Sequence, residues 1–462
     1  MMSVSVAFVF HAFQTTSSLI HEKFLKACRA GKLCDIEQLF RCHSIDLDAV
    51  GNDHKTPLFH AITARCLSAV RFLVKHGANV CKKSFVFFRL DCSAINFESC
   101  DEPPLVTAAR AGSTEILLCL LQNGCSPNQL SDSPANHAAL ASKVSTGSAL
   151  HFACDATNID MVRLLLTYNA DVNATDRRLE CPLHLVVRCK GAVCSIQCEI
   201  LDLLCKNGAK VEAMNKKECS PLYLASLYGC TSKVETLLRY GASVSSCSDR
   251  DGGYGSALHI AAFKDRAELA SLLVNNGAQI NQVNANGFTP LQLNINTHSK
   301  SDIASFLIYH GSIMNGLDKN NLSLLASCIN NLRLDCESLA VLMVEAGYDL
   351  NQDLWLVPQE LRIIFKPSSE VTTCVSSVSI PEGRVRRLCE WLHRRQRNPE
   401  ELSKLCRMVI RRQLSEALDG RSIVIGISQL PLPPALRDFV FLKSCFDCCG
   451  EQVVLNSLNH PN

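Results

Sequence analysis

The chain has 462 residues, which is enough for two or three domains or for one long array of repeats. Hydrophobic residues make up 47% and aromatic residues only 6%, so the core has to be built mostly from aliphatic and small side chains. This composition favours stacked helices over a β-sandwich, which relies on β-branched and aromatic residues. Lysine and arginine number 46 against 44 aspartates and glutamates, and the net charge of +2 gives no overall field toward nucleic acid or a membrane surface.

The N-terminal segment, residues 1–22, begins with MMSVSVAFVFHAF, a short apolar run. It lacks the basic stretch of a signal peptide and contains His11, so we expect a packed or frayed helix instead. No run of 18 apolar residues follows anywhere in the chain, so the sequence predicts no membrane span.

The 26 cysteines are scattered along the whole chain instead of following the spacings of a disulfide framework. Several lie inside apolar helical stretches, among them Cys119, Cys154 and Cys205, where a free cysteine acts as a small hydrophobe. The pattern therefore predicts free thiols in a reducing compartment, which places the protein in the cytoplasm, with the nucleus as a second compartment.

A six-residue motif recurs along the first three quarters of the chain. Its copies are TPLFHA at Thr56, PPLVTA at Pro103, SALHFA at Ser148, CPLHLV at Cys181, SPLYLA at Ser220, SALHIA at Ser256 and TPLQLN at Thr289. The shared leucines stand at positions 58, 105, 150, 183, 222, 258 and 291, so the intervals are 47, 45, 33, 39, 36 and 33. The base period is 33, with insertions in some copies, which is typical of a repeat architecture.

Each copy carries signals for where a helix begins and ends. Threonine or serine followed by Pro-Leu places a hydroxyl at the N-cap and proline at the first helical position. The alanine three residues beyond the leucine is small, as close approach of a neighbouring helix requires. A glycine 19 residues after the leucine predicts the left-handed residue that ends a second helix. Asn169 replaces glycine at that position, and asparagine tolerates this conformation.

Helix, turn, helix, glycine and hairpin at a period of 33 resemble the ankyrin repeat. The resemblance implies an all-α ankyrin-repeat solenoid of about nine helix-turn-helix units with short hairpin loops over residues 23–352, with degraded repeats as caps. The histidines of the Leu-His pairs, His151, His184 and His259, fit as hydrogen-bonding residues at helix starts and not as metal ligands.

Ankyrin arrays bind proteins through their hairpin tips and concave helix face, so the resemblance directs attention to the tips. The candidate tips are Asn173–Glu180, Ser246–Gly255 and Gln282–Phe288, although each can equally be a solvated turn. The insertions Cys81–Glu102 and Ser126–Val144 are stronger candidates, because SFVFF in the first is too apolar for an idle surface loop unless it packs on the array.

Signatures of catalysis are missing from the sequence. It contains no His-Glu-x-x-His, Gly-x-Ser-x-Gly or Walker A pattern, so we expect no catalytic residues and no cofactor. The single Cys-x-x-Cys between Cys445 and Cys448 has no second pair at zinc spacing, so no metal site is expected. In RVRRLCEWLHRRQR the charges alternate with apolar residues at helical spacing, which favours an amphipathic helix over a nucleic-acid contact.

The sequence after the array divides into a connecting segment at 353–385, a helical module at 386–442 and a tail at 443–462. A helix is predicted from NPEELSKLCRMVIRRQL, with Asn398 as N-cap, Pro399 at the first position and Glu401 completing a capping-box-like start. Its apolar stripe consists of Leu402, Cys406, Val409 and Ile410, and Arg407, Arg411 and Arg412 lie off that stripe. Alone, this helix would be an ordinary amphipathic core helix.

Two features together point further. The Leu-x-x-x-Cys spacing resembles the Elongin C-binding box, and Leu-Pro-Leu-Pro follows 24 residues after Cys406, so the module resembles a SOCS box of three short helices. The whole chain therefore resembles the ankyrin repeat and SOCS box family. Two positions differ from the family pattern, because Glu401 stands where Ser, Thr or Pro is usual and Phe439 stands where Tyr is frequent.

The resemblance implies two binding sites in the module. The residues implied for Elongin C are Leu402, Leu405, Cys406, Val409 and Ile410. Those implied for cullin-5 are Leu430, Pro431, Leu432, Pro433, Leu436 and Phe439. The Leu-Pro-Leu-Pro run is the feature that favours cullin-5 over cullin-2.

The function implied is that of a non-catalytic substrate receptor in a cullin-RING ubiquitin ligase. Its partners would be Elongin C with Elongin B, cullin-5 with a RING-box protein, and an unknown protein substrate, without nucleic acid or membrane. The receptor would act by proximity, holding lysines of the substrate near the ubiquitin thioester. The alternative is an ankyrin scaffold whose Pro431–Pro434 segment feeds an SH3 domain, although the expected basic residue is displaced by one position to Arg437.

Overall fold

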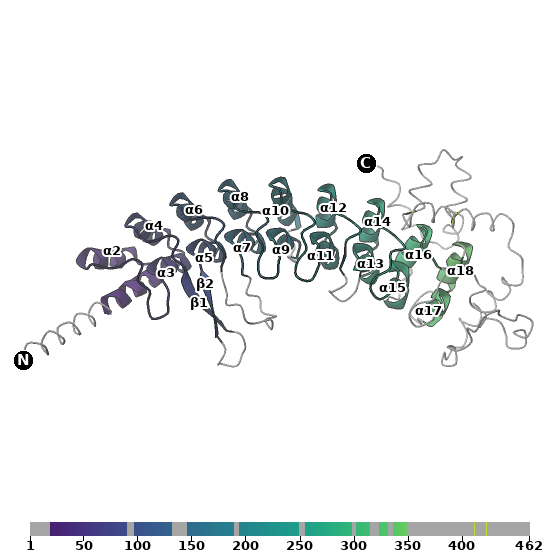
Figure 1. The fold of residues 1–462 in the computed structure, drawn as a ribbon, viewed down its shortest axis with the longest axis horizontal. Coiled ribbons are helices and arrows are strands. Elements are labelled where there is room, and N and C mark those ends of the chain that lie inside the picture. Colours follow the sequence, from purple (N-terminus) through teal and green to yellow (C-terminus); the bar gives the residue numbers. More distant parts are fainter. Residues whose placement is uncertain are drawn as a thin grey trace, which may run out of the picture. The chain divides into compact units, whose positions relative to one another are not determined.

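The computed structural model describes residues 19–89, 97–131, 146–188, 194–248, 255–297, 302–314, 323–330 and 336–346, and also 348, 411 and 422. The chain divides into two compact units, Met1–Lys216 and Lys217–Asn462. Each unit is a succession of antiparallel helix pairs (Figure 1). Over the described ranges there are nine pairs, five in the first unit and four in the second.

The first unit begins with a helix over residues 19–30, which pairs with α2 (Leu33–Cys42). Four further pairs follow: α3 (Pro57–Thr63) with α4 (Leu67–Lys75), α5 (Pro104–Ala111) with α6 (Thr114–Gln122), α7 (Ala149–Asp155) with α8 (Ile159–Thr167), and α9 (Pro182–Arg188) with α10 (Cys194–Lys206). The first helices of successive pairs pack on one another, as α3, α5, α7 and α9 do, and so do the second helices from α2 to α10.

The second unit repeats this arrangement. Its pairs are α11 (Pro221–Tyr228) with α12 (Thr231–Arg239), α13 (Ala257–Phe263) with α14 (Ala267–Asn275), α15 (Pro290–Thr297) with α16 (Asp302–Tyr309), and α17 (Leu324–Asn330) with α18 (Cys336–Ala346). Again the first helices form one stacked row and the second helices another. The predicted helical solenoid is therefore confirmed in both units.

The helix starts follow the sequence signals. Thr56 Oγ1 accepts a hydrogen bond from the amide of Phe59 at 3.2 Å, and Ser220 Oγ accepts one from the amide of Tyr223 at 3.2 Å. Both helices carry proline just inside these caps. Each cap satisfies an amide that has no partner within its own helix, and loss of such a cap costs about 1 kcal/mol.

The helix ends also follow the predicted pattern. The glycines 19 residues after the shared leucines adopt positive φ, for example +81° at Gly241, and Asn169 adopts +58°. Behind Asn169 the amide of Ala170 donates to the carbonyl oxygen of Leu165 at 3.0 Å, which closes the end of α8.

The core consists of aliphatic and small side chains, as the composition predicts. The alanines three residues beyond the shared leucines, Ala61, Ala108, Ala153, Ala225 and Ala261, are completely buried. In α15 this place is taken by Asn294, which is also fully buried and donates from Nδ2 to the carbonyl oxygen of Ala262 at 2.8 Å. The polar residue is tolerated there because the main-chain oxygen of the preceding pair supplies a partner.

The first insertion is not a loop but a hairpin, which the sequence analysis did not predict. β1 (Ser84–Arg89) pairs antiparallel with β2 (Phe97–Glu102), in a register that joins Ser84 to Glu102 and Arg89 to Phe97. The aromatic run of β1 suits a strand as well as a packed loop. In the second unit, the two-residue strands β3 (Cys247–Ser248) and β4 (Gly255–Ser256) pair at the base of another candidate tip.

Cysteines in the described ranges are mostly thiols. Thirteen of them are free, and burial raises the pKa of Cys28 and of Cys125 to about 12, so neither is a reactive thiolate. Cys230 differs, because its sulfur is disulfide-bonded.

Candidate functional site

The predicted binding residues of the C-terminal module lie outside the described part of the chain. This holds for the Elongin C set (Leu402, Leu405, Cys406, Val409, Ile410) and for the cullin-5 set (Leu430, Pro431, Leu432, Pro433, Leu436, Phe439). Two residues of the same module, Arg411 and Ser422, are described, and both are buried. Both contact the carboxyl end of α16, within the second compact unit.

Arg411 contacts the carboxyl end of α16. Its Nη2 donates to the carbonyl oxygens of Ile308 at 2.9 Å and Tyr309 at 3.0 Å. The last carbonyls of a helix have no partner within the helix and carry the negative end of its dipole. A guanidinium satisfies both needs at once, and only 4% of Arg411 is exposed to solvent.

Next to this contact, His310 joins Ser422. His310 Nδ1 and Ser422 Oγ lie 2.6 Å apart, and the two residues are 0% and 2% exposed. Burial, with a smaller contribution from the nearby Arg411 charge, lowers the pKa of His310 to about 3. The imidazole is therefore neutral at physiological pH, and the positive charge at this junction belongs to Arg411.

The ring of His310 also stacks on Phe306, one turn earlier, with ring centroids 4.2 Å apart. Through these contacts the last turn of α16 holds residues more than 100 positions downstream. The sequence pattern predicts that Arg411 lies off the apolar stripe but does not identify it as an anchor. Its positive charge was the one sign that it could contact the carboxyl end of a helix.

The histidines of the Leu-His pairs form hydrogen bonds that connect consecutive repeats. The amide of Ser148 donates to His151 Nδ1 at 3.1 Å, so the ring proton is on Nε2, which contacts the carbonyl oxygen of Glu180 at 3.1 Å. Burial lowers the pKa of His151 to about 4. His259 makes the corresponding contacts with Ser256 and with the carbonyl oxygen of Phe288. The predicted role at helix starts is confirmed, and each ring also fixes the following hairpin.

Of the candidate hairpin tips, Asn173–Glu180 and Gln282–Phe288 are fully described. Asp176 Oδ1 accepts from the amides of Arg178 and Glu180, both at 2.8 Å, and Glu180 pairs with Arg188 at 3.0 Å. Leu179 is 51% exposed at this turn. In the tip Gln282–Phe288, Asn284 Oδ1 organises the turn in the same way, by accepting from the amides of Asn286 and Phe288.

The base of the β1–β2 hairpin is anchored at both strands. Ser84 Oγ accepts from the amide of Thr56 at 3.2 Å, and Glu102 pairs with Arg110 Nη1 at 2.9 Å. Burial raises the pKa of Glu102, although the Arg110 charge acts in the opposite direction. The hairpin is thus fixed to the start of α3 and to the last turn of α5. Of the second insertion, Ser126–Val144, residues 132–145 lie outside the described ranges.

The described residues contain no group of three or more His, Cys, Asp or Glu side chains placed to hold a metal ion. None of their helices has the length and apolar character to cross a membrane.

Family models match both the helical array and the C-terminal module. Ankyrin repeats in sets of three copies match four overlapping segments between residues 86 and 284, and a single ankyrin repeat matches residues 53–84. The SOCS box matches residues 398–440. The SOCS box match contains every residue predicted for Elongin C and cullin-5.

Among individual proteins, human ankyrin repeat and SOCS box protein 16 is 25% identical over 366 residues, covering 74% of each chain. Putative ankyrin repeat protein FPV222 of fowlpox virus is 32% identical over 152 residues, which is 32% of this chain and 18% of that protein. The crystal structure of the human ASB11 ankyrin repeat domain aligns with 19% identity and a TM-score of 0.40, covering 55% of this chain and 96% of that chain.

The combination of domains and the relative that matches 74% of the chain identify the family. A SOCS box implies binding to Elongin B/C and a cullin in general, and its combination with ankyrin repeats is typical of non-catalytic substrate adaptors of ubiquitin ligases. The chain belongs to the ankyrin repeat and SOCS box family.

Proposed function

We propose that the chain is the substrate-recognition adaptor of an Elongin B/C–cullin-5–RING ubiquitin ligase. The ankyrin array would bind a target protein and the SOCS box would recruit the ligase, so that the target is ubiquitinated and degraded by the proteasome. The adaptor would be non-catalytic and would act in the cytoplasm, with the nucleus as a second compartment. It would raise the local concentration of target lysines near the ubiquitin thioester.

The contact of Arg411 with α16 is the main observation behind the proposal. Arg411 is helical and buried against the array. At about 100° per residue, the helix predicted from Asn398 would place Leu402 about 180° and Cys406 about 140° away from Arg411. Anchoring by Arg411 would thus direct the predicted Elongin C stripe away from the array.

The choice of cullin-5 rests on Leu430-Pro431-Leu432-Pro433. Prolines at these positions favour an extended segment that presents alternate leucines to a partner. Leu436 and Phe439 would continue that surface. Burying one such side chain against a partner stabilises a complex by roughly 1.5–3 kcal/mol.

Co-purification from cells tests both sites separately. Leu402→Pro with Cys406→Phe should remove Elongin B and C, because proline breaks the predicted helix and phenylalanine exceeds a pocket shaped for a thiol. Pro431→Ala with Pro433→Ala should keep the Elongins and lose cullin-5. Stoichiometric Elongin on the first variant would refute the assignment, and capture of cullin-2 by the unchanged protein would refute the choice of cullin.

A further inference from the structure

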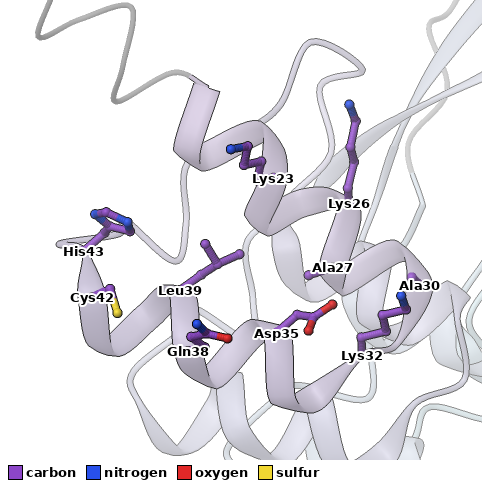
Figure 2. Close-up of a pocket in the computed structure, with 10 residues that line it drawn as sticks. All are labelled: Lys23, Lys26, Ala27, Ala30, Lys32, Asp35, Gln38, Leu39, Cys42 and His43. Carbon is purple, nitrogen blue, oxygen red and sulfur yellow. The ribbon is translucent and has the colours of Figure 1, made fainter.

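A groove lies between the helix over residues 19–30 and α2, in the first compact unit (Figure 2). It is open to solvent and has a volume of about 540 Å³. Its apolar part consists of Ala27 and Ala30 on one helix and Leu39 on the other, and Figure 2 shows Leu39 pointing toward the first helix.

The rim of this groove is basic. Lys23, Lys26 and Lys32 line it and are exposed, and Asp35 is the one carboxylate among the described residues that line it. No ion pair joins the three lysines to a carboxylate within the described ranges. The groove therefore combines an apolar floor with an excess of positive charge.

Neighbouring charged side chains have partners outside the groove, and Glu22 accepts a hydrogen bond from Asn52 Nδ2 at 3.1 Å. Arg29 pairs with Asp53 at 2.8 Å, and Arg41 pairs with Glu37 at 3.4 Å. With Asp35 counted against Lys23, Lys26 and Lys32, the lining keeps an excess of positive charge that carboxylates of an incoming partner would compensate.

The groove lies away from the side on which the first helix pair meets the next pair. Ile36 is fully buried, and Phe40 contacts Phe72 of α4 edge-to-face with ring centroids 5.6 Å apart, so this side of α2 faces the next pair. Further along, α4 has helices on both sides, α2 and α6. In the described part of the unit, the first pair has a neighbouring pair on one side only, and the groove residues lie on another face.

We propose that this groove binds an amphipathic helix of a partner protein whose apolar stripe is flanked by acidic residues. The apolar stripe would cover Ala27, Ala30 and Leu39, and the acidic flanks would reach the lysines. The chain's own residues 1–18 contain no aspartate or glutamate, so they lack the complementary charge. That this partner is the protein delivered for ubiquitination rests on the proposed function; binding in the groove does not.

A designed probe tests the proposal on the full chain. The probe is a fluorescein-labelled helical peptide of about 18 residues with leucines at positions i, i+3, i+4 and i+7 and glutamates on both flanks. Its control has the same leucines and lysines in place of the glutamates. We expect the acidic peptide to bind at least about tenfold more tightly in fluorescence anisotropy, with affinity that falls as salt is raised.

Variants locate the site. Lys23→Glu, Lys26→Glu and Lys32→Glu together should weaken binding at least about tenfold. Replacing the exposed lysines 75, 210 and 216 with glutamate changes the charge by the same amount and should leave the affinity for the peptide unchanged. Ala30→Trp, which fills the groove without changing its charge, should also abolish binding.

Equal affinity for both peptides, or binding that survives the triple reversal, would overturn the proposal. A tenfold rise in peptide affinity in Phe8→Glu with Phe10→Glu would also overturn it, because it would identify residues 1–18 as the occupant of the groove. A dimer of this chain that the triple reversal dissociates would overturn it by identifying a second copy as the occupant. Leu402→Pro with Cys406→Phe should bind the probe normally, so failure of the ligase assignment remains distinguishable.

Discussion

Arg411 donates to the carbonyl oxygen of Ile308 at 2.9 Å, although the two residues are 103 positions apart in the sequence. The same Nη2 atom also donates to the carbonyl oxygen of Tyr309, so a residue of the SOCS box caps the carboxyl end of α16. Within the second compact unit, this contact and the His310–Ser422 hydrogen bond connect the array to the C-terminal module. Two residues of the SOCS box are therefore held at the carboxyl end of one ankyrin helix.

Arg411→Ala should loosen this junction. Two buried hydrogen bonds from a charged donor would be lost, which predicts a loss of about 2–4 kcal/mol in local stability. Amide hydrogen exchange of residues 302–314 should then accelerate. Arg239→Ala is the matched control, because Arg239 is exposed and its Nη2 lies as far as 3.9 Å from Glu235 Oε1. Unchanged exchange in Arg411→Ala would contradict the anchoring role.

Short-range features of the fold could be predicted from the sequence. The cap at Thr56, the buried alanine at Ala61 and the left-handed Asn169 each follow from residue types within one repeat. Such signals are local, because each depends on the backbone of the same helix or turn.

Two other features could not be predicted, for identifiable physical reasons. The apolar run of β1 is compatible with a strand or a packed loop, and pairing with β2 decides between them. The anchor site of Arg411 consists of main-chain oxygens, which leave no mark on residue identity at Ile308 and Tyr309. Long-range contacts to backbone atoms are therefore invisible to pattern analysis of a single sequence.

Acid should destabilise the array through His151. Its pKa is about 4 in the folded protein and 6.5 in its ordinary state, so the unfolded chain binds more protons between these values. Stability should fall as the pH drops from about 6.5 to 4, by roughly 2 kcal/mol at pH 4.5 from this residue alone. Urea unfolding at pH 7 and 4.5 measures the change. In His151→Gln the difference between the two pH values should shrink, and an undiminished difference would refute the assignment.

The left-handed position that ends α12 should accept asparagine better than alanine. Gly241 has φ of +81°, and a Cβ there would meet no atom within 4 Å, so the cost of substitution is conformational. Gly241→Ala should lower the free energy of unfolding by about 1 kcal/mol. Gly241→Asn should cost less than half of that, since Asn169 occupies the equivalent position in the array. Equal losses for the two variants in urea unfolding would contradict this explanation.

Removing Arg110 should expose the cost of burying Glu102 at the base of the hairpin. The glutamate is 1% exposed, and the Arg110 charge partly offsets the rise in its pKa that burial causes. Arg110→Gln should therefore raise this pKa further and destabilise the first unit by about 2–4 kcal/mol at pH 7.

The pH dependence of this loss distinguishes the charge of Glu102 from a packing defect. A carboxyl with a raised folded pKa binds its proton more readily in the folded state, so the loss in Arg110→Gln should diminish as the pH falls toward 5. Glu102→Gln combined with Arg110→Gln removes the buried charge, and it should restore most of the stability and abolish that pH dependence. Urea unfolding of both variants at pH 7 and 5 provides the measurement. A loss that is the same at both pH values, and that persists in the double variant, would assign the effect to the contact of Arg110 with the Phe152 ring, 4.8 Å away, and not to the ion pair.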